Sequence, residues 1–481
     1  MGSTTPPPDT ESSPYSLPDK SSPSLVLTHP TDAERRRTWS LTHPLWGPAL
    51  SLDDYVNREV YLNTVPLAKD GGLTQWILTD AAFPPDERPI LSSCETLRKR
   101  ALRTFASGDS QRSENGHAVG DGDVGDDGGR VMVVDGIAYG IGAVFTEPRY
   151  RGRGYANRMM CELGPRLRGF HRRRESHGHY RNGIDLTGTT NGANGANGAI
   201  TTRRPSEEPQ EHEVLFSVLY SDIGKTFYAK AGWPAFPSTH VTFSPLAATA
   251  SPLLPPSPPL QSQQQNGHSP TRPLPPKATP LGYHELAPLC HDDSLLLRSR
   301  LITISKTTTK TAVALLPDLD QLLWHLMRED YMTKHIFGRT PTVRGAIYGD
   351  VPGRRMWAVW TRAYYGGLEK TEGNTLWFLR VVVEPGLEAE AKEHQIGKEE
   401  LVEGFKSILR IAQAEAAEWR LQEVQVWNPT GGLKRAIERS GVKCEFVERE
   451  KESIPSLMWY GDGEGGTEGL EWVCNEKYGW C

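Results

Sequence analysis

Apolar and polar positions follow regular periods in two stretches of the chain, 25–245 and 282–481, and each stretch predicts a folded domain. In the first stretch, Thr31-x-x-Glu34 has the form of a capping box and predicts a helix that begins after Thr31. A second helix is predicted after Ser51, where apolar residues recur at helical spacing. Alternating or continuously apolar runs predict strands at 73–79, 90–102, 137–146 and 215–220.

The second stretch contains the clearest helical pattern, at 399–418, where Leu401, Phe405 and Ile408 share one stripe. Strands are predicted around this helix, at 356–364, 376–383 and 421–427. Because strands alternate with helices in both stretches, the sequence indicates an α/β (α+β) fold.

Four segments lack both patterns and are rich in small and polar residues. Gly (47) and Pro (37) together make up about one residue in six of the 481, which indicates low-complexity segments. We expect a disordered tail at 1–24, surface insertions at 106–130 and 171–212, and a Pro/Ser/Gln-rich linker at 246–281. Such insertions are tolerated because loop-closure entropy grows slowly with loop length.

Charge and cysteine content exclude several classes of protein. The net charge of −5 argues against a general nucleic-acid or membrane-surface binder. No apolar run approaches the roughly 18 residues that a membrane span needs, and the first residues lack the basic start and apolar core of a secretory signal. The six cysteines are scattered without a Cys-x-x-Cys pair, so we expect no metal, no disulfide framework and a cytoplasmic protein.

One segment carries a pattern typical of ligand binding. The predicted strand 137–146 leads through the Gly-rich turn 147–154 into a helix with Tyr155, Met159 and Leu163 spaced by four, which Gly164-Pro165 is predicted to kink or end. A helix N-terminus after a Gly-rich turn binds anions, because its backbone N–H groups point outward and the helix dipole is positive there. A Rossmann site is disfavoured, because the third glycine of Gly-x-Gly-x-x-Gly is missing.

Two motifs in this region, read together, resemble those of the GNAT superfamily of acyl-CoA-dependent N-acyltransferases. Arg151-x-x-Gly154-x-Ala156 is similar to the superfamily's pyrophosphate-binding signature. Phe227-Tyr228-x-Lys230-x-Gly232-Trp233 is similar to a second characteristic element and follows the strand 215–220. The resemblance implies a mixed sheet flanked by helices, with acetyl-CoA as co-substrate.

The resemblance also implies roles for individual residues. The turn and helix start would hold the pyrophosphate of coenzyme A, and the end of the preceding strand would pair with its pantetheine arm. The cofactor-binding residues expected on this basis are Val144, Phe145, Thr146, Arg151, Gly152, Arg153, Gly154, Tyr155 and Ala156. Tyr228 would protonate the departing thiolate, which suits a phenol because its pKa near 10 keeps it protonated at neutral pH.

The expected reaction is direct transfer of acetyl to an amine through a tetrahedral intermediate, and it requires a base that removes a proton from the amine. Glu95 is the candidate, because an internal strand rarely keeps an isolated carboxylate without a partner. The alternative, that Glu95 faces solvent or pairs with Arg98, stays open. Cys94 and Cys161 have no sequence context that indicates a nucleophile.

A narrower resemblance extends over most of the chain outside the low-complexity segments. The opening Leu25-x-Leu27-Thr, the segment 92–96, the segment 328–332 and Trp357-Ala-Val-Trp360 are similar to fungal lysine N6-acetyltransferases of lysine catabolism. This resemblance implies free L-lysine as the acetyl acceptor. Lysine carries two amines and a carboxylate, so its site would need acidic groups as well as an arginine or a backbone nest. Asp53, Asp54 and Glu95 are candidates for the acidic groups.

The second stretch, 282–481, resembles a degenerate copy of the same fold. It lacks the pyrophosphate signature, and the acidic residues near Glu384 would repel phosphate, so we expect no coenzyme A binding there. Its expected role is to close the substrate site or to form a homodimer. Four tryptophans of this stretch are expected in the core rather than in a ligand cage: Trp357, Trp360, Trp377 and Trp427.

Two other functions stay open on sequence alone. A protein or polyamine N-acetyltransferase is the first, because the net charge of −5 suits any basic substrate. A non-catalytic acetyl-CoA-binding sensor or scaffold is the second. An intact Tyr228 beside an intact anion-binding turn favours the enzyme.

Overall fold

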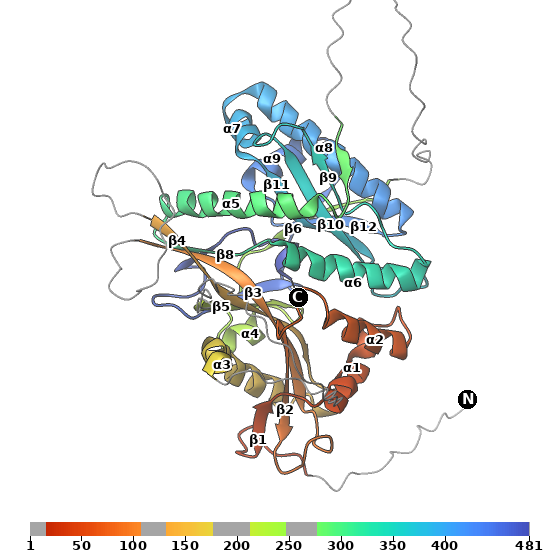
Figure 1. The fold of residues 1–481 in the computed structure, drawn as a ribbon, viewed down its shortest axis with the longest axis vertical. Coiled ribbons are helices and arrows are strands. Elements are labelled where there is room, and N and C mark those ends of the chain that lie inside the picture. Colours follow the sequence, from red (N-terminus) through yellow and green to blue (C-terminus); the bar gives the residue numbers. More distant parts are fainter. Residues whose placement is uncertain (1–15, 107–130, 177–211, 247–276, 481) are drawn as a thin grey trace, which may run out of the picture.

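The computed structural model describes residues 16–106, 131–176, 212–246 and 277–480 (Figure 1). Most of the expected insertions and linker lie outside these residues. The expected tail is different, because residues 16–24 are described and pack on the fold. Leu17 packs against the first domain's core, and the Pro18 carbonyl accepts a hydrogen bond of 2.6 Å from the Tyr155 hydroxyl. The tail is therefore ordered closer to the N-terminus than the sequence predicts.

The first half of the chain alternates strands and helices much as predicted. Its elements are β1 (Leu25–Thr28), α1 (Asp32–Trp46), α2 (Leu52–Leu62), β2 (Leu73–Asp80), β3 (Ser92–Ala106), β4 (Val131–Phe145), α3 (Tyr155–Ser176), β5 (Val214–Ser221), α4 (Thr226–Lys230) and β6 (Thr239–Phe243). The capping box at Thr31 is present, and the Ser51 side chain caps α2. The helix α3 does not end at Pro165 but continues to Ser176, so that prediction is wrong as to its end.

The second half contains the remaining elements. They are β7 (Thr279–Leu281), α5 (Leu286–Ser305), β8 (Thr311–Leu315), α6 (Leu319–Phe337), β9 (Gly345–Tyr348), β10 (Met356–Ala363), β11 (Thr375–Val383), α7 (Pro385–Glu393), α8 (Gln395–Glu418), β12 (Glu423–Trp427), α9 (Gly431–Arg439), β13 (Glu445–Glu448), β14 (Ile454–Trp459) and β15 (Leu470–Trp472). The expected mixed α/β architecture with a second GNAT-like unit is confirmed. In both units a long strand is followed by a helix and then by a parallel strand, as in β4–α3–β5 and in β11–α8–β12.

The two units exchange strands, which the sequence does not predict. The first sheet has the order β1-β2-β3-β4-β5-β14, so its last strand comes from the C-terminal end of the chain. The second sheet has the order β13-β6-β12-β11-β10-β9-β7, so β6 from the first half lies beside β12. The expected domains 25–245 and 282–481 are therefore not independent units, because each supplies a strand to the other's sheet.

The two sheets face each other across a shared apolar core. Ala138 and Phe216 of the first sheet pack in this core with Val359 and Leu379 of the second. The helices α5 and α6 cross the middle of the molecule (Figure 1), and both contribute side chains to this shared core. The outer face of the first sheet is covered by α3 and α4, whereas α8 and α9 cover the outer face of the second.

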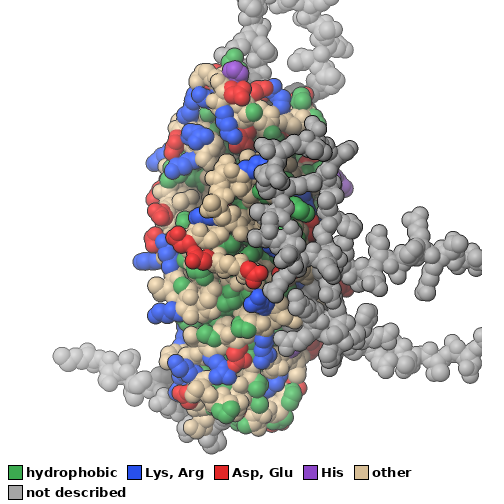
Figure 2. Space-filling view, turned by 90° about the vertical axis from the view of Figure 1, so that its left-hand side faces the viewer, with side chains coloured by type: hydrophobic (Ala, Val, Ile, Leu, Met, Phe, Trp, Pro, Cys, Tyr) green, Lys and Arg blue, Asp and Glu red, His purple; other side chains and the backbone are tan. Residues whose placement is uncertain are grey.

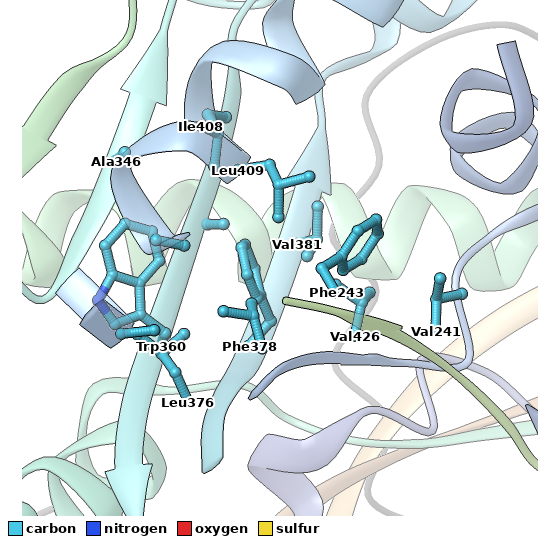
Figure 3. Close-up of a cluster of buried hydrophobic side chains, with 14 of the residues drawn as sticks. Val241, Phe243, Ala346, Trp360, Leu376, Phe378, Val381, Ile408, Leu409 and Val426 are labelled. Atoms are coloured by element: carbon cyan, nitrogen blue, oxygen red, sulfur yellow. The ribbon is translucent and has the colours of Figure 1, made fainter. Parts of the chain in front are cut away.

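The exchanged strand β6 is part of the second unit's core. Val241 and Phe243 lie among side chains of β10, β11 and β12, with Leu409 of α8 above them (Figure 3). Both residues are fully buried. Removing β6 from this sheet would therefore expose the core beneath α8.

Buried ion pairs also join segments that are distant in sequence. The Arg380 guanidinium on β11 lies 2.7 Å from Asp293 of α5 and also pairs with Glu476 near the C-terminus. Glu329 of α6 accepts hydrogen bonds from Arg344 at 2.7 Å and from Arg362 at 2.6 Å. Removing one partner of such a pair is costly, because the other charge stays buried and uncompensated.

The surface mixes charges of both signs. On the face shown in Figure 2, basic and acidic side chains are interspersed with apolar and neutral ones. Among the described residues, no helix has the length and apolar character to cross a membrane.

The strand exchange predicts that neither half of the chain folds alone. We expect a fragment of residues 16–246 to show no cooperative thermal unfolding, because β5 lacks β14 and β6 lacks β12. Co-expression with residues 277–481 should restore a soluble complex with a single transition, measured by calorimetry. A cooperative transition of the first fragment by itself would contradict this prediction.

Candidate active site

The turn after β4 has the geometry of an anion-binding site. Gly152 and Gly154 have φ of +76° and +82°, values that favour glycine, and α3 begins directly afterwards at Tyr155. The Arg151 side chain donates a 3.0 Å hydrogen bond to the Thr146 carbonyl, which fixes the turn to the end of β4. Arg151 and Arg153 are exposed. The backbone therefore presents the N-terminus of a long helix, with two cations beside it, as a pyrophosphate would need.

A third cation lies at the same turn. A Cβ placed on Gly154 would come within 2.6 Å of the Lys20 side chain, so Lys20 lies against the turn. The Arg158 guanidinium of α3 also donates to the Lys20 carbonyl at 3.1 Å. Sequence reasoning missed Lys20, because it belongs to a segment whose composition is typical of a disordered tail.

The strands β4 and β5 part at the point where β4 bulges. Their parallel pairing ends at Ile141 opposite Leu219. Beyond that point the register with β3 shifts, so that Glu95 lies opposite Gly142 and Ser93 opposite Phe145. Ala143 in the bulge has φ of +50°. The end of β4, including Val144, is therefore without a β5 partner, as a pantetheine arm adding along this strand would require.

A cavity of about 990 Å³ opens at this point and extends between the two sheets. Its first-sheet wall includes Gln75, Glu95, Gly142, Ala143, Val144 and Tyr220. Its second-sheet wall includes Thr375, Trp377, Glu423, Gln425 and Trp427. The helix α2 contributes Tyr55, Arg58 and Glu59, while α4 contributes Tyr228. Both halves of the chain thus form one site.

Glu95 lies inside the cavity and is half-buried, with partners other than Arg98. Its Oε1 accepts hydrogen bonds from Gln75 Nε2 at 2.8 Å and from Trp39 Nε1 at 3.3 Å. Burial and the nearby Glu59 carboxylate together raise the pKa of Glu95 to about 7. A carboxyl group with this pKa can exchange a proton at neutral pH, which is what a general base requires.

Tyr228 lines the same cavity from α4. It is buried, and burial raises the pKa of its phenol above the ordinary value of 10.0, with further contributions from Cys94 and Asp222. Tyr228 is therefore protonated at neutral pH and can donate a proton. Gly232, with φ of +106°, follows the end of the helix as predicted.

Asp53 and Asp54 are not in the cavity, which corrects the expectation that they bind the substrate. Both lie in the first turn of α2, where their negative charges interact favourably with the positive end of the helix dipole. Asp54 accepts a 2.7 Å hydrogen bond from Ser51 Oγ and lies 3.7 Å from the His335 ring. The acidic residue of α2 that lines the cavity is Glu59, five residues after Asp54.

The remaining expectations for this domain concern the end of β4 and the cysteines. Phe145 packs against Trp46 rather than facing the cavity, and its carbonyl accepts a 2.9 Å hydrogen bond from Ser92 Oγ. Burial raises the pKa of the Cys94 thiol above the ordinary value of 9.0. A thiol that stays protonated is a poor nucleophile.

The second-sheet wall contains tryptophans in two roles. Trp357 and Trp360 are core residues, as expected. Trp377 and Trp427 also line the cavity, and with Trp480 they surround the buried Lys477 ammonium at 3.6, 4.2 and 4.1 Å from the ring centroids. Trp427 is a buried core residue as expected, whereas Trp377 is only partly buried. The two also form part of a cage around a lysine of the same chain, which the sequence did not predict.

The position in the second unit that corresponds to the anion-binding turn is acidic. Glu384 precedes α7, and its carboxylate accepts hydrogen bonds of 2.8 Å from both the backbone N–H and Nε of Arg355. A negative side chain that is held in this place disfavours phosphate; that this unit does not bind coenzyme A stays a prediction.

Two sequence comparisons relate parts of this chain to known proteins. Residues 257–481 match the family model described as the LYC1 GNAT-like C-terminal domain. A lysine acetyltransferase of Yarrowia lipolytica (strain CLIB 122 / E 150) is 29% identical over 201 residues, which cover 42% of this chain and 38% of that protein. The chain thus matches well under half the length of this relative.

Solved structures are similar to this chain only at low sequence identity and low TM-score. A probable N-acyltransferase of Enterococcus faecalis V583 is 10% identical with a TM-score of 0.42, and 90% of this chain and 71% of that chain are covered. A tandem GNAT protein from the clavulanic acid biosynthesis pathway is 10% identical with a TM-score of 0.37, covering 92% and 99%. The fold assignment rests on the topology described above.

The strand, Gly-rich turn, helix and parallel strand β4–α3–β5 form the GNAT-like arrangement that the two motifs imply. The C-terminal half of the chain is similar to the LYC1 GNAT-like family. Among the described residues, no group of His, Cys, Asp and Glu side chains could hold a metal ion.

The raised pKa of Glu95 predicts an effect on stability. Because its folded pKa of about 7 lies above the ordinary value of 4.5, ionisation between these pH values destabilises the folded chain. We expect Glu95→Gln to match the wild type near pH 4.5 and to be more stable at pH 8 by up to about 3 kcal/mol, measured by urea unfolding. A stability difference that is the same at both pH values would contradict the assignment.

Proposed function

We propose that this protein transfers acetyl from acetyl-CoA to the N6-amine of free L-lysine. The observation that carries the proposal is the single cavity in which Glu95 and Tyr228 both lie, at the point where β4 and β5 part. A group that accepts a proton near pH 7 and a group that donates one thus share one site. The name of the Yarrowia lipolytica relative, a lysine acetyltransferase, supports lysine as the acceptor.

Different residues would bind acetyl-CoA, accept a proton and donate a proton in such a reaction. Bound acetyl-CoA supplies the acyl group and a thiolate leaving group. The anion-binding turn from Arg151 to Ala156 would hold its pyrophosphate, and the unpaired end of β4 at Val144 would orient its pantetheine arm. Glu95 accepts the proton that the lysine ammonium loses before attack, and the tetrahedral intermediate then collapses as Tyr228 protonates the sulfur.

The form of the cavity supports a small acceptor. Its walls come from two sheets that face each other, and a volume of about 990 Å³ is in the range of small-molecule sites. Glu95, once ionised, supplies negative charge for a cationic amine, whereas the Glu59 carboxylate beside it pairs with Arg58. A protein or polyamine acceptor, and a non-catalytic acetyl-CoA sensor, are the alternatives that the assay below separates. We further propose a role in lysine catabolism in the cytoplasm.

A substrate panel tests the proposal. Coenzyme A release should be observed with acetyl-CoA and free L-lysine, and should be much slower with polyamines or a lysine-containing peptide. Tyr228→Phe should lower kcat on lysine by roughly 10²- to 10⁴-fold, because the thiolate then leaves without a proton donor. Acetyl-CoA binding without turnover on any amine would instead indicate a sensor.

The pH dependence tests the base. Glu95 accepts a proton only when it is ionised, so kcat/KM for lysine should rise with pH through an inflection near 7. Glu95→Gln should lower the rate by about 10²-fold or more and remove this inflection. Lysine titrates identically in both assays, so the comparison isolates the enzyme group. An inflection that persists in Glu95→Gln would assign the base to another residue.

A further inference from the structure

Arg449 is a buried cation without a counter-ion in the part of the chain that the structure describes. It follows β13, is 6% exposed and lines the cavity. Its Nε, Nη1 and Nη2 atoms are all buried and have no hydrogen-bond partner among the described residues. Its guanidinium carbon lies 3.8 Å from the centroid of the Trp427 ring. The side chain is therefore held in place by stacking, while its donors stay unsatisfied.

This arrangement contrasts with the other deeply buried arginines. Arg344, Arg362 and Arg380 each pair with carboxylates of the same chain. A buried charge that is not paired is strongly unfavourable, so such groups usually have a partner. Burial lowers the pKa of Arg449 from 12.5 to about 10, which leaves it charged at neutral pH. The missing partner is thus an anion.

Two neighbours of Arg449, His240 and Glu450, do not supply that anion, and no carboxylate of the described residues forms an ion pair or a hydrogen bond with it. His240 of β6 has a pKa lowered to about 4 by burial and by Arg449 itself, so its ring is neutral. Its Nδ1 atom is also buried without a partner among the described residues. Glu450, the next residue in the chain, pairs with Lys225 at 2.7 Å. The planar fork of Arg449 therefore faces a space in which a carboxylate could accept two parallel hydrogen bonds.

We propose that Arg449 binds the carboxylate of the amino-acid substrate and so selects a free amino acid over a simple amine. This inference rests on the proposed function, because it names the residue that binds the carboxylate end of lysine, the end remote from Glu95. The C-terminal half of the chain thereby supplies substrate recognition, while the first half supplies the reaction.

Glu95 and Arg449 lie on different walls of the cavity. Glu95 belongs to β3 of the first sheet, where it lies opposite Gly142. Arg449 follows β13 of the second sheet and lies beside Tyr220 of β5. A substrate with its amine at Glu95 and its carboxylate at Arg449 would therefore extend across the cavity between the two sheets.

Arg328 is the rival candidate. It lines the same cavity, and its guanidinium carbon lies 5.6 Å from the centroid of the Trp480 ring. Arg328 is only partly buried, whereas all three guanidinium nitrogens of Arg449 are enclosed. The greater burial makes Arg449 the stronger anchor, because hydrogen bonds gain strength where water is excluded.

The test compares L-lysine with 1,5-diaminopentane, which is lysine without its carboxylate. In the wild type, kcat/KM should be much higher for lysine. Arg449→Met should lower kcat/KM for lysine on the order of 100-fold, as expected for the loss of charge-assisted hydrogen bonds, and should change the value for 1,5-diaminopentane by less than about threefold. Arg449→Lys should recover part of the preference for lysine.

Controls separate recognition from folding. The melting temperature of Arg449→Met should equal or exceed that of the wild type, because an unpaired buried charge is replaced by an apolar chain of similar length. Arg435→Met removes an exposed arginine of α9 and should change neither substrate preference nor stability. Equal losses on both substrates in Arg449→Met would assign it a structural role and overturn the proposal. A selective loss of lysine in Arg328→Met alone would also overturn it.

Binding without turnover distinguishes this proposal from the proposed function. L-lysine in the absence of acetyl-CoA should raise the melting temperature of the wild type but not that of Arg449→Met. If the wild type binds lysine in this way but transfers no acetyl group, the carboxylate site stands and the enzyme function fails. If the wild type acetylates lysine and Arg449→Met does so equally well, the function stands and the carboxylate site is overturned.

Discussion

The open edges of β5 and β12 are the constraint on which the rest of the structure depends. Each strand is the last of a parallel pair, and a sheet edge with apolar faces must be covered or paired. β5 is paired by β14 from the C-terminal end, and β12 is paired by β6 from the first half. This reciprocal exchange binds the two units together and sets the inner faces of their sheets against each other.

The cavity is a consequence of that arrangement. Where β4 bulges and parts from β5, the shared core does not fill the space between the two sheets, and polar side chains of both units line that space. Glu95 and Glu59 stand on the side of the first unit, whereas Arg449 and the tryptophans around Lys477 stand on the other. Neither unit contains both sets. A degenerate second copy of the fold thus completes a site that it could not form alone.

The site retains charges that the folded chain does not neutralise by itself. Glu95 has a raised pKa because it is partly buried near another carboxylate, and Arg449 is enclosed without an anion among the described residues. The structural ion pairs elsewhere, such as Arg380 with Asp293, are complete. These two charged groups therefore lower the free energy of unfolding, compared with paired or apolar side chains in the same places. Such a loss of stability is typical of functional residues.

The sequence by itself determined what depends on neighbouring residues. The capping box at Thr31, the turn from Arg151 to Ala156, and the short helix with Tyr228 all depend on backbone preferences over a few positions. Tertiary structure alone decided the strand exchange, the exclusion of Asp53 and Asp54, and the place of Arg449. These depend on pairings between residues more than 200 positions apart, such as Ser453 with Asp222, which no local pattern encodes. Long-range pairing is decided by the burial of whole faces, so a residue's chemistry indicates its role only once the opposite wall of the cavity is known.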